Sequence, residues 1–189
     1  SFPTRRSSDL GEVWIIGTPA EEGGAGKAIM LERGGFDGVD FALMIHPTCG
    51  GESRDYIYRN GRASGSLTIS FTGQSAHSSA PATGINALTA AISVFNQIDM
   101  LRPLFETEDN VNGVILEGGT ASNIIPGFSK SEFCIRAATM KRVDELQNMI
   151  ISCAKRAESL TGAKVQIQSE PIYAERYPCL PICEDFKEN

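Results

Sequence analysis

The chain lacks the features that mark membrane proteins and nucleic-acid-binding proteins. Among its 189 residues, no apolar run approaches the roughly 20 residues that a membrane-spanning helix needs. The formal net charge is −6 at pH 7, and lysine and arginine form no cluster. Binding to nucleic acid depends on basic patches. We therefore expect neither a membrane nor nucleic acid as a partner.

The cysteines also lack the pattern of a disulfide framework. They form an odd set without a CxxC pair, at Cys49, Cys134, Cys153, Cys179 and Cys183. Such a set indicates reduced thiols and a cytoplasmic location, while a signal peptide ahead of this sequence stays open. Cys134 and Cys153 lie among apolar residues, so we expect both in the core.

The first ten residues, "SFPTRRSSDL", lack the period of a strand or a helix. They resemble the translation of a common sequencing adapter, and we exclude residues 1–10 from the fold; a natural disordered terminus is the alternative. Because they carry two arginines and one aspartate, the net charge without them is −7. With 41% hydrophobic residues, the chain has the composition of a globular protein of one large or two small domains.

Residues 11–61 follow the pattern of a strand, helix, strand unit. "EVWIIG" at 12–17 and "FALMI" at 41–45 are continuous apolar runs, typical of strands buried on both faces of a parallel sheet. Between them, "GKAIMLERGG" at 26–35 has helical spacing and closes on two glycines. The crossover of such a unit is expected to be right-handed.

Two adjacent carboxylates, Glu21 and Glu22, follow the first predicted strand, and His46 follows the second. Open α/β sheets form ligand crevices at the carboxyl ends of their strands, so these side chains should share one edge. A carboxylate pair there suits a metal site, since one member binds the cation while its neighbour handles a proton of bound water. The alternative is a solvated loop before a helix. His46 beside the pair favours the metal site.

From residue 62 the pattern changes to alternating strands and amphipathic helices. The predicted elements are a strand over 65–73, a helix over 84–101, strands over 111–119 and 131–137, a helix over 142–160 and a strand over 164–170. This order is that of a ferredoxin-like domain, predicted over residues 62–170. Residues 171–189 leave it, and "EDFKEN" opens a helix that is not completed. We expect both ends of the sequence to be truncated.

Five motifs in order carry a family resemblance. They are "GTPAEEGGAGK", "MIHP", "GQSAHSSAP", "GGTASNIIPG" and "FCIRA". Together they resemble the co-catalytic metallopeptidase and amidohydrolase family of aminoacylases and glutamate carboxypeptidases, closest to aminobenzoyl-glutamate utilisation hydrolases and β-alanyl dipeptidase-like proteins. The resemblance covers residues 11–189. It implies an α/β fold in which a zinc-peptidase-like catalytic domain, partly present at 11–61 and again at 171–189, carries an inserted ferredoxin-like α+β lid and dimerisation domain at 62–170.

The resemblance also implies roles for the polar residues of the first domain. Glu21 matches the general base that activates a metal-bound water, and Glu22 matches a ligand of one metal ion. His46 falls where the amidohydrolase-like members place a histidine ligand. This favours hydrolysis of an amide bond in a dipeptide or an N-acyl amino acid.

Three residues of the predicted lid match further site positions. His77 matches a catalytic histidine that lies in a loop and reaches the active site of the partner subunit; a polar loop residue is the alternative. Asn123 matches an amide in the substrate cleft, although an asparagine before a proline also suits a turn. Arg136 matches a position that binds a substrate carboxylate, and an exposed strand arginine is the alternative.

The resemblance implies two divalent metal ions and a homodimer through the lid domain. Carboxylate and imidazole ligands suit Zn²⁺ and Mn²⁺ alike. Only two of the protein ligands, Glu22 and His46, are present, whereas a catalytic zinc site has three. We therefore expect the parent protein to be an enzyme and this fragment to be inactive alone. A non-catalytic binding or scaffold protein that keeps the fold and the dimer surface is the alternative.

Overall fold

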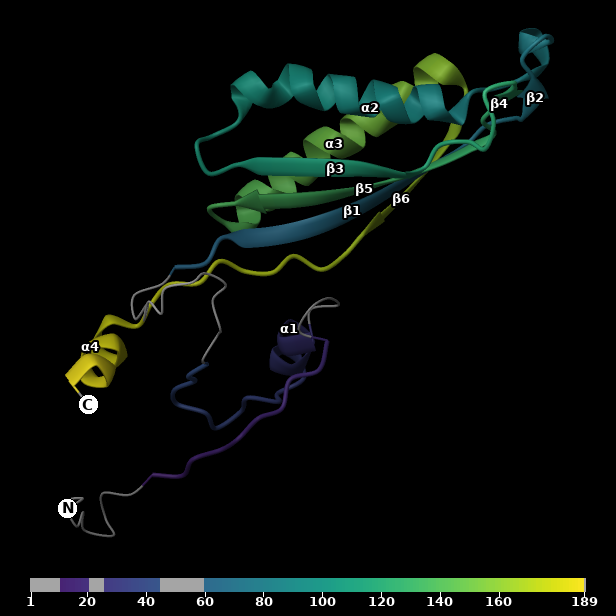
Figure 1. The fold of residues 1–189 in the computed structure, drawn as a ribbon. Helices are drawn as coiled ribbons and strands as arrows, with labels where there is room; N and C mark the ends of the chain where they lie inside the picture. The colour runs from purple at the N-terminus through teal and green to yellow at the C-terminus, as the bar shows by residue number, and fades with distance from the viewer. Residues whose placement is uncertain (1–10, 21–25, 45–59, 189) are drawn as a thin grey trace, which may run out of the picture. The chain divides into compact units, whose positions relative to one another are not determined.

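The structure is a computed structural model, and it describes residues 11–20, 26–44 and 60–188. The chain divides into two compact units, Ser1–Met44 and Ile45–Asn189. The second unit contains both β-sheets found among the described residues (Figure 1).

In the first unit, the predicted short helix is present as α1 (Gly26–Glu32). The helix ends where Gly34 adopts a φ of +77°, a conformation that side chains disfavour. The N–H of Gly35 then donates to the carbonyl of Met30, with 2.7 Å between nitrogen and oxygen. The helix with a glycine stop is thus confirmed.

The two buried strands predicted in this unit are not confirmed. Residues 12–17 form no strand, and Val13 and Ile15 are 93% and 99% exposed. Residues 41–44 form no strand either, and Phe41 is 71% exposed. A strand buried on both faces needs a neighbouring strand on each side, and the described residues of this unit supply none. The strand predictions are therefore wrong for this chain.

The second unit is built on a four-stranded antiparallel sheet. Its strands are β1 (Ala63–Thr72), β3 (Asn110–Glu117), β5 (Phe128–Ala137) and β6 (Lys164–Ser169), in the spatial order β3-β5-β1-β6. Helices α2 (Ala87–Leu101) and α3 (Met140–Thr161) lie on one face of this sheet (Figure 1). The order along the chain is strand, helix, strand, strand, helix, strand, which confirms the ferredoxin-like domain.

The core lies between this sheet and the two helices. Strands β1 and β5 each bury every second residue, as the alternation of side chains along a strand requires. The rings of Phe95 on α2 and Phe133 on β5 pack with their centroids 5.0 Å apart. Gly113 of β3 makes room for this pair, because a Cβ there would lie 2.5 Å from the ring of Phe133.

Local polar signals set the ends of the two long helices. At the start of α2 the side chain of Asn86 accepts from the N–H of Thr89 at 3.1 Å. At the start of α3 the hydroxyl of Thr139 accepts from the N–H of Arg142 at 3.2 Å. Gly162, with a φ of +78°, follows the end of α3. These caps set the ends of the helices, and the bounds predicted from apolar spacing lie within a few residues of them.

Several short elements were not predicted from the sequence with their observed bounds. They are β2 (Ala76–His77), β4 (Ile124–Ile125), the 3₁₀ helices η2 (Pro81–Thr83) and η3 (Arg102–Leu104), and α4 (Leu180–Glu188), which begins before the predicted helix opening at "EDFKEN". Strands β2 and β4 pair with each other as a separate two-stranded sheet. Two residues are too few to show a period, so such strands are visible only through their pairing.

Of the two cysteines predicted in the core, Cys153 is buried and Cys134 is exposed. Cys134 lies on the face of β5 that points away from the helices, in register with Ser66 of β1 and Asn112 of β3. The prediction for Cys134 is wrong because its apolar neighbours in the sequence occupy the opposite face of the strand. Burial raises the pKa of the Cys153 thiol.

This difference predicts the order in which the thiols react. A raised pKa leaves less thiolate at a given pH, and burial blocks access, so iodoacetamide at pH 8 should alkylate Cys134 at least roughly tenfold faster than Cys153. Peptide mass spectrometry over a time course measures both rates. The two rates should converge in denaturant. Equal rates in the folded chain would contradict the placement of Cys134.

Candidate functional site

Three predicted site residues, Glu21, Glu22 and His46, lie outside the described residues. Their roles as general base and metal ligands therefore stay predictions. Among the residues that the structure describes, no group of three or more histidine, cysteine, aspartate or glutamate side chains is placed to hold a metal ion.

His77 is exposed and ends strand β2, rather than lying in the predicted loop. The backbone N–H of Ser79 donates to its Nδ1 at 3.2 Å, and the Ser79 hydroxyl lies 2.8 Å from the same atom. A neutral imidazole whose Nδ1 accepts a hydrogen bond carries its proton on Nε2. The turn after β2 therefore makes Nε2 the donor of this exposed ring.

Asn123 lies beside His77 across the two-stranded sheet. It is the exposed turn residue before β4, and its carbonyl accepts from the N–H of Ser78 at 2.9 Å. We call residues 73–86 and 118–127 the tip, which lies at one end of the large sheet (Figure 1). The structure thus brings together two predicted site residues that are far apart in the sequence.

Backbone contacts join the two segments of the tip to each other and to the start of α2. The N–H of Gly73 donates to the carbonyl of Gly127 at 2.8 Å, and the N–H of Ala87 donates to the carbonyl of Pro126 at 2.8 Å. A Cβ on Gly127 would lie 2.7 Å from the backbone nitrogen of Ser75. The glycine therefore allows the close approach that sets the position of β2.

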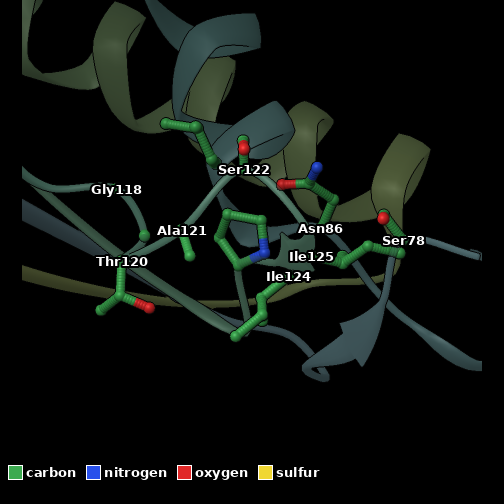
Figure 2. A pocket seen from close by; sticks show the side chains of 11 residues that line it. Ser78, Asn86, Gly118, Thr120, Ala121, Ser122, Ile124 and Ile125 are labelled. Atoms are coloured by element: carbon green, nitrogen blue, oxygen red, sulfur yellow. The ribbon is translucent and has the colours of Figure 1, made fainter.

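The tip contains a pocket with a volume of about 500 Å³ (Figure 2). Its lining combines apolar side chains with hydroxyl groups and one amide, from Ser78, Asn86, Leu88, Thr120, Ser122, Ile124, Ile125 and Pro126. Of the described residues that line it, none carries a charge. Such a lining suits an uncharged group. Two of the lining residues, Ser78 and Ser122, are adjacent in the sequence to His77 and Asn123.

Arg136 lies at the opposite end of the sheet from the tip. It is an exposed residue of β5, in register with Ser64 of β1 and Asn110 of β3. Thr72 and Phe128 pair at the end nearest the tip. The eight positions from Phe128 to Arg136 correspond to about 27 Å along an antiparallel strand. The structure therefore does not bring Arg136 together with the predicted site residues of the tip within one chain.

A partly buried ion pair that the sequence did not reveal holds the loop before β3. Arg142, on the first turn of α3, donates to Asp109 through Nε at 3.0 Å and Nη2 at 2.7 Å, and the side chain of Asp109 is 1% exposed. The same guanidinium donates to Glu145 at 3.0 Å and to the carbonyl of Leu104 at 3.2 Å. The bond to Asp109 most of all, and then the bond to Glu145, raise the pKa of Arg142, so the cation persists.

The family described as the peptidase dimerisation domain of M20 proteins matches residues 57–159, more than half of the chain. The chain belongs to the M20 peptidase and amidohydrolase family. The matched residues begin before β1 and end within α3, so the M20 dimerisation domain includes all of the ferredoxin-like domain up to that helix. This confirms the family that the five sequence motifs predict.

Curated relatives and solved structures agree with this membership. Xaa-Arg dipeptidase of Mus musculus is 33% identical over 180 residues, which are 94% of this chain and 41% of the relative. A chain of the p-aminobenzoyl-glutamate hydrolase of Escherichia coli (strain K12) is 29% identical over 172 residues, 89% of this chain and 35% of that protein. A crystal structure of an aminobenzoyl-glutamate utilization protein from Klebsiella pneumoniae matches 68% of this chain and 33% of its own, with a TM-score of 0.58 and 18% identity. The M20 chain thus spans less than half the length of these relatives.

The close approach of Gly127 to the backbone of Ser75 predicts that a methyl group added at Gly127 lowers the stability of the protein. In Gly127→Ala the methyl group meets the backbone of Ser75, so β2 must shift, and the free energy of unfolding should fall by about 1–3 kcal/mol. Urea unfolding followed by circular dichroism measures this change. Gly17→Ala is the matched control, since a Cβ there has no atom within 4 Å. Equal stability of the two variants would contradict the packing of the tip.

Proposed function

We propose that the full-length M20 protein hydrolyses an amide bond in a dipeptide or an N-acyl amino acid with the help of divalent metal ions. The observation that carries this proposal is the exposed His77, whose Nδ1 accepts from the backbone N–H of Ser79, at the position where the family motif has a histidine. Relatives named as a dipeptidase and as a hydrolase of aminobenzoyl-glutamate support the reaction class. They favour an enzyme over a non-catalytic scaffold.

The proposed reaction assigns a separate task to each polar residue. Glu22 and His46 would hold metal, and their carboxylate and imidazole donors suit Zn²⁺ and Mn²⁺. Bound metal would polarise the carbonyl and lower the pKa of a bound water. Glu21 takes the proton of the attacking water as general base. His77 donates from Nε2 to the carbonyl oxygen on which negative charge develops.

The dimer is proposed to form through strand β3. This strand is at the end of the sheet order, so its outer side has no strand partner among the described residues. Val114, Ile115 and Leu116 of β3 are 48%, 40% and 52% exposed. An exposed apolar edge readily pairs with another strand, and a two-fold dimer pairs such an edge with itself.

The other edge of the sheet is protected against pairing. Strand β6 exposes the polar residues Lys164, Gln166 and Gln168, and Lys164 lies 3.7 Å from a carboxylate oxygen of Glu158. Charged and polar side chains on an edge strand discourage association. The proposal therefore places the second copy on β3 and leaves β6 free of it.

A dimer gives a reason for the separation of the tip from Arg136. His77 and Asn123 of one chain would reach the metal site of the partner. Arg136 lies at the end of the sheet where the chain enters β1, and there it would bind a substrate carboxylate. Each active site would then draw groups from two chains.

We also propose that the protein is cytoplasmic, because its cysteines form an odd set without a CxxC pair in the sequence. Within the ranges that the structure describes, no helix is long and apolar enough to cross a membrane.

Substitution of the proposed base should separate catalysis from metal binding. In the full-length protein, Glu21→Gln should lower turnover by about 10²–10⁴-fold, the usual worth of general acid–base catalysis. Its metal content should stay near wild type, because the base is not a ligand. Glu22→Ala is the contrasting variant and should lose metal as well as activity. Elemental analysis after dialysis and steady-state kinetics measure both, and wild-type turnover of Glu21→Gln would refute the assignment.

Mixing two inactive variants tests the shared site. Heterodimers of Glu21→Gln and His77→Ala contain one site in which both groups are intact. After random exchange of subunits, about a quarter of wild-type activity should return. Adding Ile115→Lys to both chains should abolish this recovery, because it places a charge on the proposed interface. Gln166→Lys in both chains is the matched control on the β6 edge and should leave the recovery unchanged.

Subunit exchange is verified in the same mixture by native mass spectrometry of differently labelled chains. If heterodimers form and no activity returns, His77 does not act in the partner's site.

A further inference from the structure

The segment that follows β6 is bound along the first half of β1. The N–H of Tyr173 donates to the carbonyl of Ser64 at 2.8 Å, and the N–H of Ser64 donates back to Tyr173 at 3.1 Å. Gly61 and Arg176 exchange a second pair of backbone bonds, at 3.1 Å and 2.8 Å. The segment entering the sheet and the segment leaving it therefore form one two-stranded ribbon.

An apolar side chain attaches this ribbon to the core. Ile172 packs against the buried cluster beneath α3. A Cβ on Gly65 of β1 would lie 2.7 Å from Gln147, 3.0 Å from Val143 and 3.5 Å from Ile172. The missing side chain of Gly65 thus leaves room for these three residues to meet. Ile172 is therefore a fixed contact of the dimerisation domain and not a free linker residue.

A carboxylate from the same segment binds the start of α3. Oε2 of Glu175, a partly buried residue, accepts from the backbone N–H of Met140 at 2.8 Å. Met140 is the first residue of α3, and the first N–H groups of a helix have no partner within the helix. An acidic side chain at this end is also favoured by the helix dipole. Glu175 and the hydroxyl of Thr139 thus cap α3 together.

The entering segment has a weaker side-chain contact. Arg62 donates to the carbonyl of Glu108 at 3.3 Å, and its Nε lies 3.9 Å from the Glu108 carboxylate, with both side chains about half exposed. Exposed ion pairs contribute little to stability, typically about 0–1 kcal/mol. The bond from Met140 to Glu175 is therefore a stronger attachment of the ribbon than the contact of Arg62.

We infer that residues 171–176 are a docked part of the dimerisation domain, and that Glu175 is a positioning residue that fixes the direction in which the chain leaves it. Any rotation of this domain relative to the residues that follow would then occur beyond Arg176. The role in catalysis rests on the proposed function: the ribbon contains Ser64, the residue in register with Arg136, so it sets where Arg136 meets the substrate.

Amide hydrogen exchange of the 189-residue chain tests the docking without any need for activity. In Glu175→Ala, the amides of Met140 and Arg176 should exchange roughly fivefold faster, the usual effect of losing a helix cap. Glu175→Gln keeps an acceptor oxygen and should restore most of the protection. Glu170→Ala is the matched control, because it removes the same charge one residue before the docked segment, and in the described structure the Glu170 side chain makes no hydrogen bond or ion pair. The core amide of Ile135 reports on global unfolding and should be unchanged.

Kinetics of the full-length protein test the positioning role. If Glu175 acts through Arg136, Glu175→Ala should raise KM for substrates with a free carboxylate about fivefold and leave kcat and bound metal near wild type. A protein that is only less stable would lose active enzyme at an unchanged KM. Glu170→Ala should match wild type in both constants.

The outcomes separate the two proposals. Exchange in Glu175→Ala that is no faster than in Glu170→Ala overturns the docking, and faster exchange with an unchanged KM overturns the positioning role. Faster exchange in a chain whose wild-type parent hydrolyses no amide supports the docking and refutes the proposed function.

Discussion

The register between β1 and β5 is the constraint on which the rest of the second unit depends. It runs unbroken over ten pairs, from Ala63 opposite Ala137 to Thr72 opposite Phe128. Because side chains alternate along a strand, this register turns the apolar residues of both strands toward α2 and α3 and leaves polar residues on the open face. It also decides which residues lie near the tip and which lie near the ribbon. A shift of this register by one residue would turn the buried side chains of a strand to the outer face of the sheet.

The sequence was sufficient for elements that carry their own period and their own caps. Helices α2 and α3 have an apolar stripe and are preceded by the capping residues Asn86 and Thr139, so local chemistry determines them. Prediction from the sequence failed where an element depends on partners that are distant along the chain. Residues 12–17 are as apolar as a buried strand, yet the described residues of their unit offer no neighbouring strand. Strands β2 and β4 are too short for any period and exist only as a pair.

The same distinction holds for the candidate site: motifs identify single residues, and only the fold shows which residues are neighbours. Motifs identified His77, Asn123 and Arg136, but only the pairing of β2 with β4 shows that the first two are neighbours and that the third lies elsewhere. The ion pair of Asp109 with Arg142 joins residues 33 positions apart and had no signal in the sequence. Charges of opposite sign are common in any chain, and only the fold decides which of them meet.

Because the tip and the ribbon lie at opposite ends of the sheet, a small rotation of the dimerisation domain at the ribbon produces a larger displacement at the tip. A rotation of about 2° at the ribbon, acting over a strand length of about 27 Å, moves the tip by about 1 Å. A misplacement of that size is enough to cost about 10²-fold in the rate of an enzyme. If His77 acts as proposed, the contacts of Glu175 and Ile172 would therefore limit how accurately its remote imidazole is placed. Small substitutions far from any reacting atom can thus change the geometry of the site.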